Sequence, residues 1–429
     1  MKRSRPRRRR TDRVRYYRAV LPALLIAWLL AGALASGCAE RVLARREPAA
    51  ATHTTPRLVD ERFPAARAAR PLPRTVRAIW VARFHYRYPD DVRTIIRNCA
   101  ALGANTILWQ VRGEGTVSYR SRLEPWSKEF SYRDPGFDPL AVAVDEAHRQ
   151  ELRIEAWMNV LPGWRGSSPP PIREQLYHQH PDWFLRDGAG RLQTAGDFYL
   201  LLNPCLPEVR AHLVALADEL LANYALDGIH LDYVRYAWET TPKARQRYPR
   251  DARTLELYAR QTGRHPDDDA RAWDVWRANQ LTRLVNEIRA ALDRRRPGAT
   301  LTAAVKPDPR DAYENYFQNA AGWLREGLLD AIMPMSYTKR ADALERFIAA
   351  YRTAAPGGRI VPGLGVYLHD DAAATREQLR LCERWGGDYA LFSYESLHAT
   401  AADRPRGPSA ETQSLRTARR ELLQASLGR

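Results

Sequence analysis

The stretch DGIHLDYVRY (residues 227–236) places a short apolar run between a turn pair and a group of charged and aromatic side chains. Side chains alternate along a strand, so His230 and Asp232 share one face and Asp227 lies on the other. At about 3.3 Å per residue, Asp227 and Asp232 are roughly 16 Å apart, too far for a catalytic pair of carboxylates. We therefore expect Asp227 and Gly228 to open a buried strand and Asp232 to lie at its C-terminal tip.

Seven more apolar runs alternate with amphipathic, helix-like segments. These runs are VRAIWVARF (76–84), NTILWQV (105–111), LRIEAWMN (152–159), ATLTAAV (299–305), LDAIMPMSY (329–337), IVPGLGVYL (360–368) and DYALFSY (388–394). The helix-like segments are 91–102, 139–150, 207–224, 277–295, 343–354 and 373–385. Eight strands alternating with helices over about 320 residues predict an α/β fold, a single (β/α)8 TIM barrel. The alternative is a doubly wound open sheet, but no glycine-rich turn follows the first run.

The barrel is expected at 75–400, followed by a linker and a last helix at 401–429. Its extra length lies after the second, third and fourth predicted strands, at 113–138, 160–207 and 233–268. In a barrel these are βα loops on the C-terminal face, where barrel enzymes place their chemistry. Three long neighbouring loops predict a cleft for an extended ligand.

The N-terminal segment 1–37 is expected to be a signal sequence, and 38–74 a flexible tether rich in Ala, Pro and Arg. Its cationic start is followed by an uncharged apolar segment and then Cys38, an order typical of export signals. The ending LASGC resembles a bacterial lipoprotein signal, which implies acylation of Cys38 and a membrane anchor. In that class Ala39 is the outer-membrane default, facing the periplasm. An uncleaved apolar anchor is the alternative.

The net charge of +17 suggests a nucleic-acid binder until its location is examined. Residues 1–37 hold ten Lys or Arg and one Asp, which supply +9 of that charge, so we expect no nucleic-acid partner. Cys99, Cys205 and Cys382 lie far apart, and the histidines show no H-E-x-x-H spacing. We expect no metal and no cofactor.

Side-chain alternation in the other strands predicts a polar rim at the C-terminal face. Gln110 and Arg112 are expected to share a face in the second strand, and Asn159 to lie above Glu155 in the third. The side chains expected at the rim are Gln110, Arg112, Glu114, Asn159, Asp232, Arg235, Tyr337, Ser393 and Glu395. Such groups are costly to bury unless they bind each other or a ligand.

Carbohydrate hydrolysis suits this set, because it needs two carboxyl groups, one protonated and one ionised. Asp232, next to Arg235, is expected to be the ionised group, and an ion pair with Arg235 alone is the structural alternative. The partner acid is either Glu114 or Glu395, and the sequence does not decide between them. The loops also offer flat rings suited to sugars, at Tyr119, Trp126, Trp164, Trp183, Tyr233, Tyr236 and Trp238.

Several stretches resemble, in order, the bacterial glycosyl-hydrolase-like family ten, over about residues 75–400. They are RAIWVARF, NTILWQVRGEG, SRLEPWS, EAWMNVLPG, HPDWFLRDGAGR, YLLNPCLPEVR, DGIHLDYVRY, DAIMPMSYT and FSYES. The resemblance implies a (β/α)8 enzyme of the cell envelope that hydrolyses glycosidic bonds. Peptidoglycan glycan strands are the implied substrate, and one branch acts at the division site on strands stripped of stem peptides.

Carried over, the site of that family falls on seven positions of this chain: Gln110, Arg112, Asn159, His230, Asp232, Arg235 and Tyr337. The chain departs from the family pattern at Glu155 and Cys205, so the neighbouring positions are less secure as functional positions. Two alternatives remain. One is a barrel that binds glycan or a division partner without cutting it, and the other is a hydrolase of exopolysaccharide.

Overall fold

The computed structural model describes residues 69–427 except for 194–198, 237–243, 405–406 and 408. The predicted signal sequence, Cys38 and most of the tether lie outside the described residues, as does Trp238. Among the described helices, none combines the length and the hydropathy needed to cross a bilayer.

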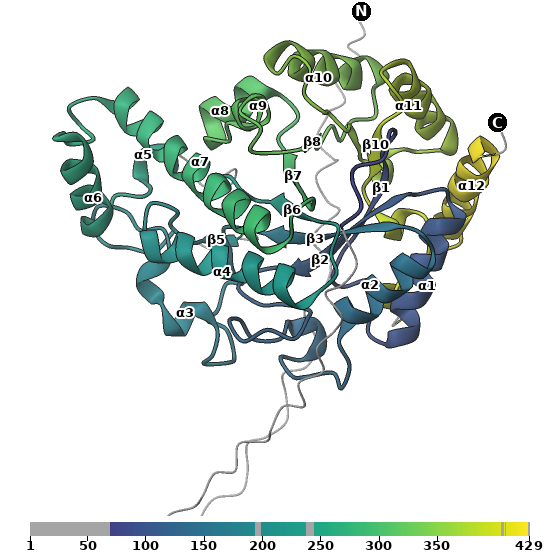
Figure 1. The fold of residues 1–429 in the computed structure, drawn as a ribbon, viewed down its shortest axis with the longest axis horizontal. Coiled ribbons are helices and arrows are strands. Elements are labelled where there is room, and N and C mark those ends of the chain that lie inside the picture. Colours follow the sequence, from purple (N-terminus) through teal and green to yellow (C-terminus); the bar gives the residue numbers. More distant parts are fainter. Residues whose placement is uncertain (1–68, 194–198, 237–243, 405–406, 408, 428–429) are drawn as a thin grey trace, which may run out of the picture. The chain divides into compact units, whose positions relative to one another are not determined.

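Eight parallel strands form the centre of the fold, with helices around them (Figure 1). The strands are β1 Arg77–Val81, β2 Thr106–Arg112, β3 Arg153–Asn159, β6 Gly228–Asp232, β7 Thr300–Val305, β8 Ala331–Pro334, β9 Gly363–Leu364 and β10 Tyr389–Leu391. They lie in the order β8-β7-β6-β3-β2-β1-β10-β9. Parallel bridges from Ile332 to Ile360 and from Met335 to Gly363 join β8 to β9. The sheet is therefore a nearly closed (β/α)8 barrel, which confirms the predicted fold.

The helices follow the predicted alternation. They are α1 Pro89–Ala101, α2 Pro139–Arg149, α3 Leu176–Gln179, α4 Pro207–Asn223, α5 Ala244–Arg247, α6 Ala252–Thr262, α7 Ala270–Arg295, α8 Pro309–Tyr316, α9 Ala320–Arg325, α10 Ala341–Ala354, α11 Ala372–Arg384 and α12 Ala410–Leu427. Local capping sets several starts, as at α2, where the Asp138 carboxylate accepts from the Leu140 and Ala141 N–H groups. The Asp269 cap starts α7 earlier than the hydrophobic periodicity suggested. Neither α8 nor α9 was predicted.

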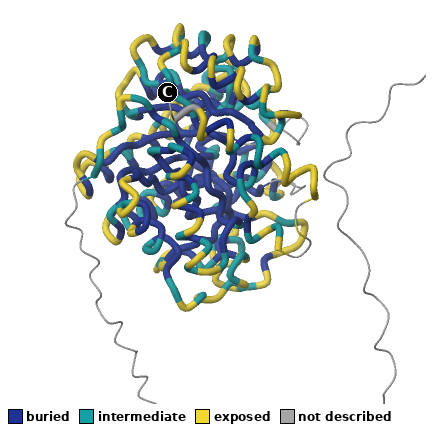
Figure 2. The backbone as a smooth tube through the Cα atoms, turned by 90° about the vertical axis from the view of Figure 1, so that its right-hand side faces the viewer, coloured by how far each residue is buried: buried dark blue, intermediate teal, exposed yellow. Residues whose placement is uncertain are grey.

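Two apolar layers lie on opposite sides of the barrel wall. Alternate residues of β1, such as Ala78 and Trp80, fill the lumen together with Leu108, Trp157 and Met333. The residues between them face outward and pack on the helices in the larger core. Figure 2 shows buried residues concentrated along the central strands, with exposed ones towards the periphery.

The long loops that follow β2, β3 and β6 carry structure of their own. The loop after β2 contains the 3-10 turn η1 Lys128–Phe130, and the loop after β6 contains α5 and α6. The loop after β3 folds into an antiparallel hairpin of β4 Pro162–Arg165 and β5 Tyr199–Leu201, with α3 and η2 Pro181–Trp183 between the strands. All three loops start at the C-terminal rim, so they surround the predicted site.

Candidate active site

Four neighbouring strands each bring a polar side chain to the C-terminal rim. Arg83 follows β1, Gln110 lies near the end of β2, Asn159 ends β3 and Asp232 ends β6. The Arg83 N–H and Nη1 donate to Gln110 Oε1 at 3.1 and 3.3 Å, and Gln110 Nε2 donates to Asn159 Oδ1 at 3.3 Å. Asn159 and Asp232 are register partners across β3 and β6. The structure thus brings Gln110, Asn159 and Asp232 together, as predicted.

The chain turns sharply immediately after Asp232. Tyr233 has a φ of 51°, in the left-handed region that bulky residues rarely adopt. Its N–H donates to Asp232 Oδ1 at 2.6 Å, and its ring lies 4.3 Å from the Arg235 guanidinium carbon. The turn fixes the orientation of a carboxylate that is only 5% exposed. Backbone held in such a conformation is common where a side chain must be aimed at a ligand.

Arg83 connects the rim to Glu114, which begins the loop after β2. Arg83 Nη2 donates to Glu114 Oε2 at 2.5 Å, while Lys128 Nζ lies 3.2 Å from Glu114 Oε1. Burial acts to lower the pKa of Arg83, but Glu114 and Glu129 outweigh it and hold that pKa above its ordinary value. Gly113 leaves room for this guanidinium, because a Cβ there would lie 2.5 Å from Arg83 Nε. Glu114 is thus a buried carboxylate with two cationic partners.

Arg112 does not lie beside Gln110, so the expectation that the two share a face was wrong. The register of β2 on β3 shifts between them, so Gln110 pairs with Trp157 and Arg112 with Met158, on opposite faces of β3. Such a bulge reverses the alternation locally. Arg112 makes two bonds to Glu124, at 2.8 and 2.7 Å, and donates to the carbonyls of Val160 and Pro162 at 3.0 Å. These contacts fasten the two loops to each other.

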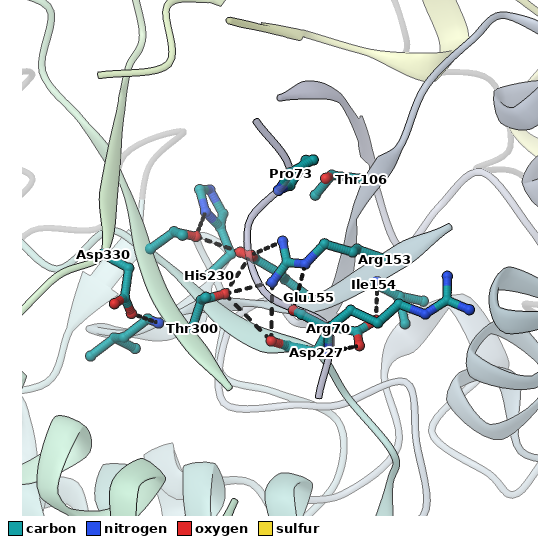
Figure 3. Close-up of polar contacts among 12 residues, drawn as sticks. Arg70, Pro73, Thr106, Arg153, Ile154, Glu155, Asp227, His230, Thr300 and Asp330 are labelled. Carbon is teal, nitrogen blue, oxygen red and sulfur yellow. Dashed lines mark hydrogen bonds and ion pairs between the residues drawn. The ribbon is translucent and has the colours of Figure 1, made fainter. Parts of the chain in front are cut away.

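His230 lies beneath Asp232 inside the barrel and belongs to a buried polar network (Figure 3). Its Nδ1 is 2.8 Å from Thr302 Oγ1, which donates to Glu155 Oε2 at 2.5 Å. Arg153 Nη1 and Thr300 Oγ1 both donate to the other Glu155 oxygen, at 2.9 Å. Glu155 is therefore deep in the lumen, as expected, and organises the barrel from below.

Asp227 occupies the opposite end of β6, as the alternation and length arguments predicted. Its carboxylate accepts from the Ile154 N–H at 2.9 Å and the Arg70 N–H at 2.8 Å (Figure 3). It also lies 3.1 Å from His148 Nε2. Burial acts to raise the pKa of Asp227, but these hydrogen bonds dominate and lower it. Asp227 thus has a structural role at the N-terminal end of the barrel.

An aromatic group covers the β8 to β10 side of the rim, centred on Phe392. Tyr337 stacks on Phe392 with ring centroids 5.1 Å apart. Tyr367 and Trp157 contact Phe392 edge-on at 6.0 and 6.4 Å. Burial, and next the nearby Asp232 carboxylate, raise the pKa of Tyr337 well above its ordinary value. Tyr337 therefore lies close to Asp232, as predicted. The rings offer apolar surface beside the polar side chains of the rim, which are Arg83, Gln110, Asn159 and Asp232.

Glu395, the other predicted acid, lies in the 3-10 turn η4 Tyr394–Ser396 after β10. Its Oε2 is 3.6 Å from His85 Nε2, and its side chain is 41% exposed. Burial acts to raise the pKa of Glu395, but His85 outweighs it and the pKa falls below its ordinary range. Arg416 of α12 donates to the Glu395 carbonyl at 2.7 Å, so the last helix fixes this turn.

Tyr236, predicted to contact substrate, is fully buried. Its hydroxyl lies 3.5 Å from Cys205 Sγ, and its ring meets Phe317 edge-on at 5.6 Å. Tyr236 therefore packs behind the rim, and Cys205, the departure from the family pattern, supplies part of its pocket.

Three residues at the rim, Arg83, Tyr199 and Phe392, were missed by sequence reasoning. Strand alternation would turn Arg83 outward with Ile79, but β1 ends at Val81, so the rule no longer applies. Tyr199 belongs to a hairpin within a segment that showed no strand pattern. The run DYALFSY did contain Phe392, yet nothing local distinguished it from a core residue.

The rim offers a fixed carboxylate, a second buried carboxylate, amide groups and stacked rings. Within the described residues, no three His, Cys, Asp or Glu side chains gather as a metal site would require. A family model described as glycosyl hydrolase-like 10 matches residues 75–355. The chain belongs to this family. Its fold and its family are therefore glycoside hydrolase-like.

Curated relatives carry matching names. The chain is 27% identical over 263 residues to glycosyl hydrolase DigH of Escherichia coli (strain K12), covering 55% of each protein. It is 24% identical over 307 residues to glycosyl hydrolase YngK of Bacillus subtilis (strain 168), covering 62% of this chain and 54% of that protein. The chain thus spans about half the length of these curated relatives.

Solved structures share the fold at low identity. The glycoside hydrolase domain of PgaB (BpsB) from Bordetella bronchiseptica superposes with a TM-score of 0.58 at 15% identity, covering 81% of this chain and 98% of that domain. Alpha-L-fucosidase isoenzyme 2 from Paenibacillus thiaminolyticus gives 0.55 at 16%, covering 82% and 49%. These likenesses concern the barrel alone.

Proposed function

We propose that this chain is an exported, membrane-anchored glycoside hydrolase that cleaves a polysaccharide, with peptidoglycan glycan strands as its substrate. The observation that carries the proposal is the position of Asp232. It ends β6 at the C-terminal rim, the face on which barrel enzymes place catalytic groups, and a sharp turn fixes its carboxylate. Family membership and the relatives named glycosyl hydrolase support the same reaction class.

In the proposed hydrolysis Asp232 either attacks the anomeric carbon as nucleophile, forming a glycosyl-enzyme that water then hydrolyses, or acts as general base on the water that attacks this carbon. Gln110 and Asn159 lie at the same rim as Asp232 and offer amide groups to sugar hydroxyls. The rings of Tyr337 and Tyr367, which meet edge-on at 6.0 Å, each supply an apolar surface of the kind that sugar rings pack against. The proton for the departing oxygen comes from Glu114 or Glu395.

The leader supports the proposed location. A cationic and then apolar N-terminus ending in Cys38 is the sequence expected of an outer-membrane lipoprotein. A barrel tethered there would face the periplasm, where glycan strands are within its reach.

A second candidate function is a barrel that holds glycan without cutting it. The ion pairs of the two candidate acids favour this alternative. Glu114 forms ion pairs with Arg83 and Lys128, and Glu395 lies beside His85 with a lowered pKa, whereas a general acid must carry a proton.

The full chain in mild detergent tests the proposal beside its Asp232→Asn, Glu114→Gln and Glu395→Gln variants. Each protein is incubated with intact sacculi, with sacculi stripped of peptides by an amidase, and with exopolysaccharide. Mass spectrometry then identifies released fragments and new sugar ends. Cleavage of sacculi by wild type but not by D232N supports a peptidoglycan glycosidase, and the inactive Gln variant names the acid. Binding without cleavage favours the second candidate, and cleavage of exopolysaccharide alone would remove peptidoglycan as the substrate.

A further inference from the structure

The β4–β5 hairpin carries an exposed arginine beside the candidate active site. The hairpin is attached to the rim next to Asp232, because the Val160 N–H donates to the Asp232 carbonyl at 2.7 Å. The chain then enters β4, whose last residue, Arg165, is exposed to solvent while the rest of the strand is buried. Arg165 is therefore the one residue of β4 that a ligand at the rim can reach.

An aromatic ring that is itself fixed in the site holds the guanidinium of Arg165. Arg165 and Tyr199 are register partners across the hairpin, and the guanidinium carbon lies 5.7 Å from the centre of the Tyr199 ring. Tyr199 is buried, its hydroxyl accepts from Asn159 Nδ2 at 3.5 Å, and its ring meets that of Tyr233 edge-on at 5.0 Å. Because a guanidinium over an aromatic face keeps its N–H groups available, Arg165 is oriented before a ligand arrives.

Arg165 differs from two other arginines of the rim in having no carboxylate partner. Arg83 pairs with Glu114 at 2.5 Å, and Arg112 pairs with Glu124 at 2.7 Å. Within the part of the chain that the structure describes, no Asp or Glu side chain forms an ion pair with Arg165. The planar guanidinium fork matches the two oxygens of a carboxylate, so an oriented arginine without an anion is suited to bind one from a ligand.

The order of the strands places Asp232 between this cation and the aromatic group of the rim. The rings centred on Phe392 cover the β8 to β10 side, and the hairpin follows β3. In the sheet β6 lies between β8 and β3, so its tip at Asp232 separates the rings from the hairpin. A glycan that packs on the rings and passes Asp232 therefore continues towards Arg165, which meets a sugar beside the cleaved bond.

We propose that Arg165 is a specificity-determining residue that binds a carboxylate carried by a sugar next to the cleaved bond. The inference rests on the proposed function and adds to it that the substrate is an acidic glycan. In peptidoglycan the matching group is the lactyl carboxyl of the muramyl sugar, which is free where the stem peptide has been removed. Because Arg165 lies beside the reacting bond, it contributes to binding rather than to chemistry.

The direct test measures binding by calorimetry, with the full chain in mild detergent carrying D232N so that glycan is not consumed. The probes are soluble strand fragments from amidase-stripped sacculi, and the same fragments with their carboxylates converted to neutral amides. D232N is expected to bind the charged fragments about 3–10-fold more tightly than the neutral ones. Adding Arg165→Gln should abolish this preference, whereas Arg376→Gln, at an exposed position of α11, should keep it.

Equal affinity of D232N for the two forms would overturn the proposal, as would a preference that persists in R165Q or the absence of binding to either form. Melting curves confirm that each variant is folded. Arg165→Met, which also lacks the charge but keeps the aliphatic stem, replaces R165Q if that variant does not fold.

Cleavage of the same two probes separates this inference from the proposed function. R165Q in the active chain is expected to raise KM for the charged fragments about 3–10-fold with kcat little changed, and to leave cleavage of the neutral fragments as in wild type. If wild type cleaves both forms with the same kcat/KM, the role of Arg165 is refuted and the glycosidase stands. If wild type cleaves neither form, the proposed function fails, and the binding measurements on D232N still decide the role of Arg165.

Discussion

The indole Nε1–H of Trp80 donates to Nε2 of His230 at 3.1 Å, inside the lumen of the barrel. Because an indole N–H only donates, Nε2 must be the accepting nitrogen, and the proton of a neutral imidazole then lies on Nδ1, facing Thr302. Both nitrogens of His230 are engaged by protein groups. His230 thus acts as a neutral link between the lumen network and the aromatic rings below the site.

This relationship predicts a pH dependence of stability. Burial lowers the pKa of His230 from 6.5 to about 3, so its stabilising contribution is complete above pH 6.5 and is lost as the pH falls towards 3. Over that range His230 contributes a slope of about 1.4 kcal/mol per pH unit to the free energy of unfolding. When urea unfolding is measured at several pH values, His230→Gln should lower the slope of the unfolding free energy against pH by this amount. His265→Gln, at an exposed position, is the control, and equal slopes in all three proteins would contradict the assignment.

Replacing the carboxylate of Asp232 by an amide should remove activity while leaving the fold intact. Asp232→Asn keeps the shape of a side chain that already accepts from the Tyr233 N–H. We expect kcat on the identified glycan to fall by about 10³ or more, with a melting temperature close to wild type. Asp218→Asn, whose partner is the exposed Arg295, should retain full activity. An active D232N protein would assign Asp232 a structural role.

The buried Arg83–Glu114 pair predicts a non-additive effect on stability. Arg83→Met leaves a buried carboxylate without its closest cation and should cost about 3–5 kcal/mol of unfolding free energy. The double variant R83M/E114Q should recover part of that loss, because Glu114 is no longer charged and only Glu129, 3.5 Å from Arg83 Nε, still loses its cation. Urea unfolding of the single and double variants measures the coupling. As a matched control, Arg310→Met at the exposed pair with Glu314 should cost less than about 1 kcal/mol, and additive losses at Arg83 and Glu114 would refute the coupling.

Tyr367, half exposed beside Phe392, predicts a stacking contribution to glycan binding. Tyr367→Ala should raise KM by about 3–10-fold with kcat nearly unchanged, since the half-exposed ring packs on Phe392 and contributes packing rather than chemistry. Steady-state kinetics on soluble glycan fragments checks this. Tyr88→Ala removes a similarly exposed ring at the start of α1 and should leave KM as in wild type. A fall in kcat alone would assign Tyr367 a different role.

Much of the site could be predicted from the sequence wherever strand alternation applies. Asp232 and Asn159 end their strands and Gln110 precedes the bulge in β2, so their shared direction follows from a period of two. Tyr337 ends the predicted sixth strand and does lie near Asp232. The same rule failed for Arg112, because a single bulge in β2 turned it onto Glu124.

The sequence by itself determined the number and order of the eight barrel strands, the main helices between them, and the position of Asp232 at a strand tip. These depend on local periodicity and on turn and capping residues. Only the tertiary structure decided which polar groups meet. Arg83 lies beyond the end of β1 and still pairs with Glu114. Tyr199 lies on the β4–β5 hairpin and bonds Asn159, although the two residues are 40 positions apart in the sequence. Such contacts depend on the closure of the barrel and the folding of its loops, which no local pattern encodes.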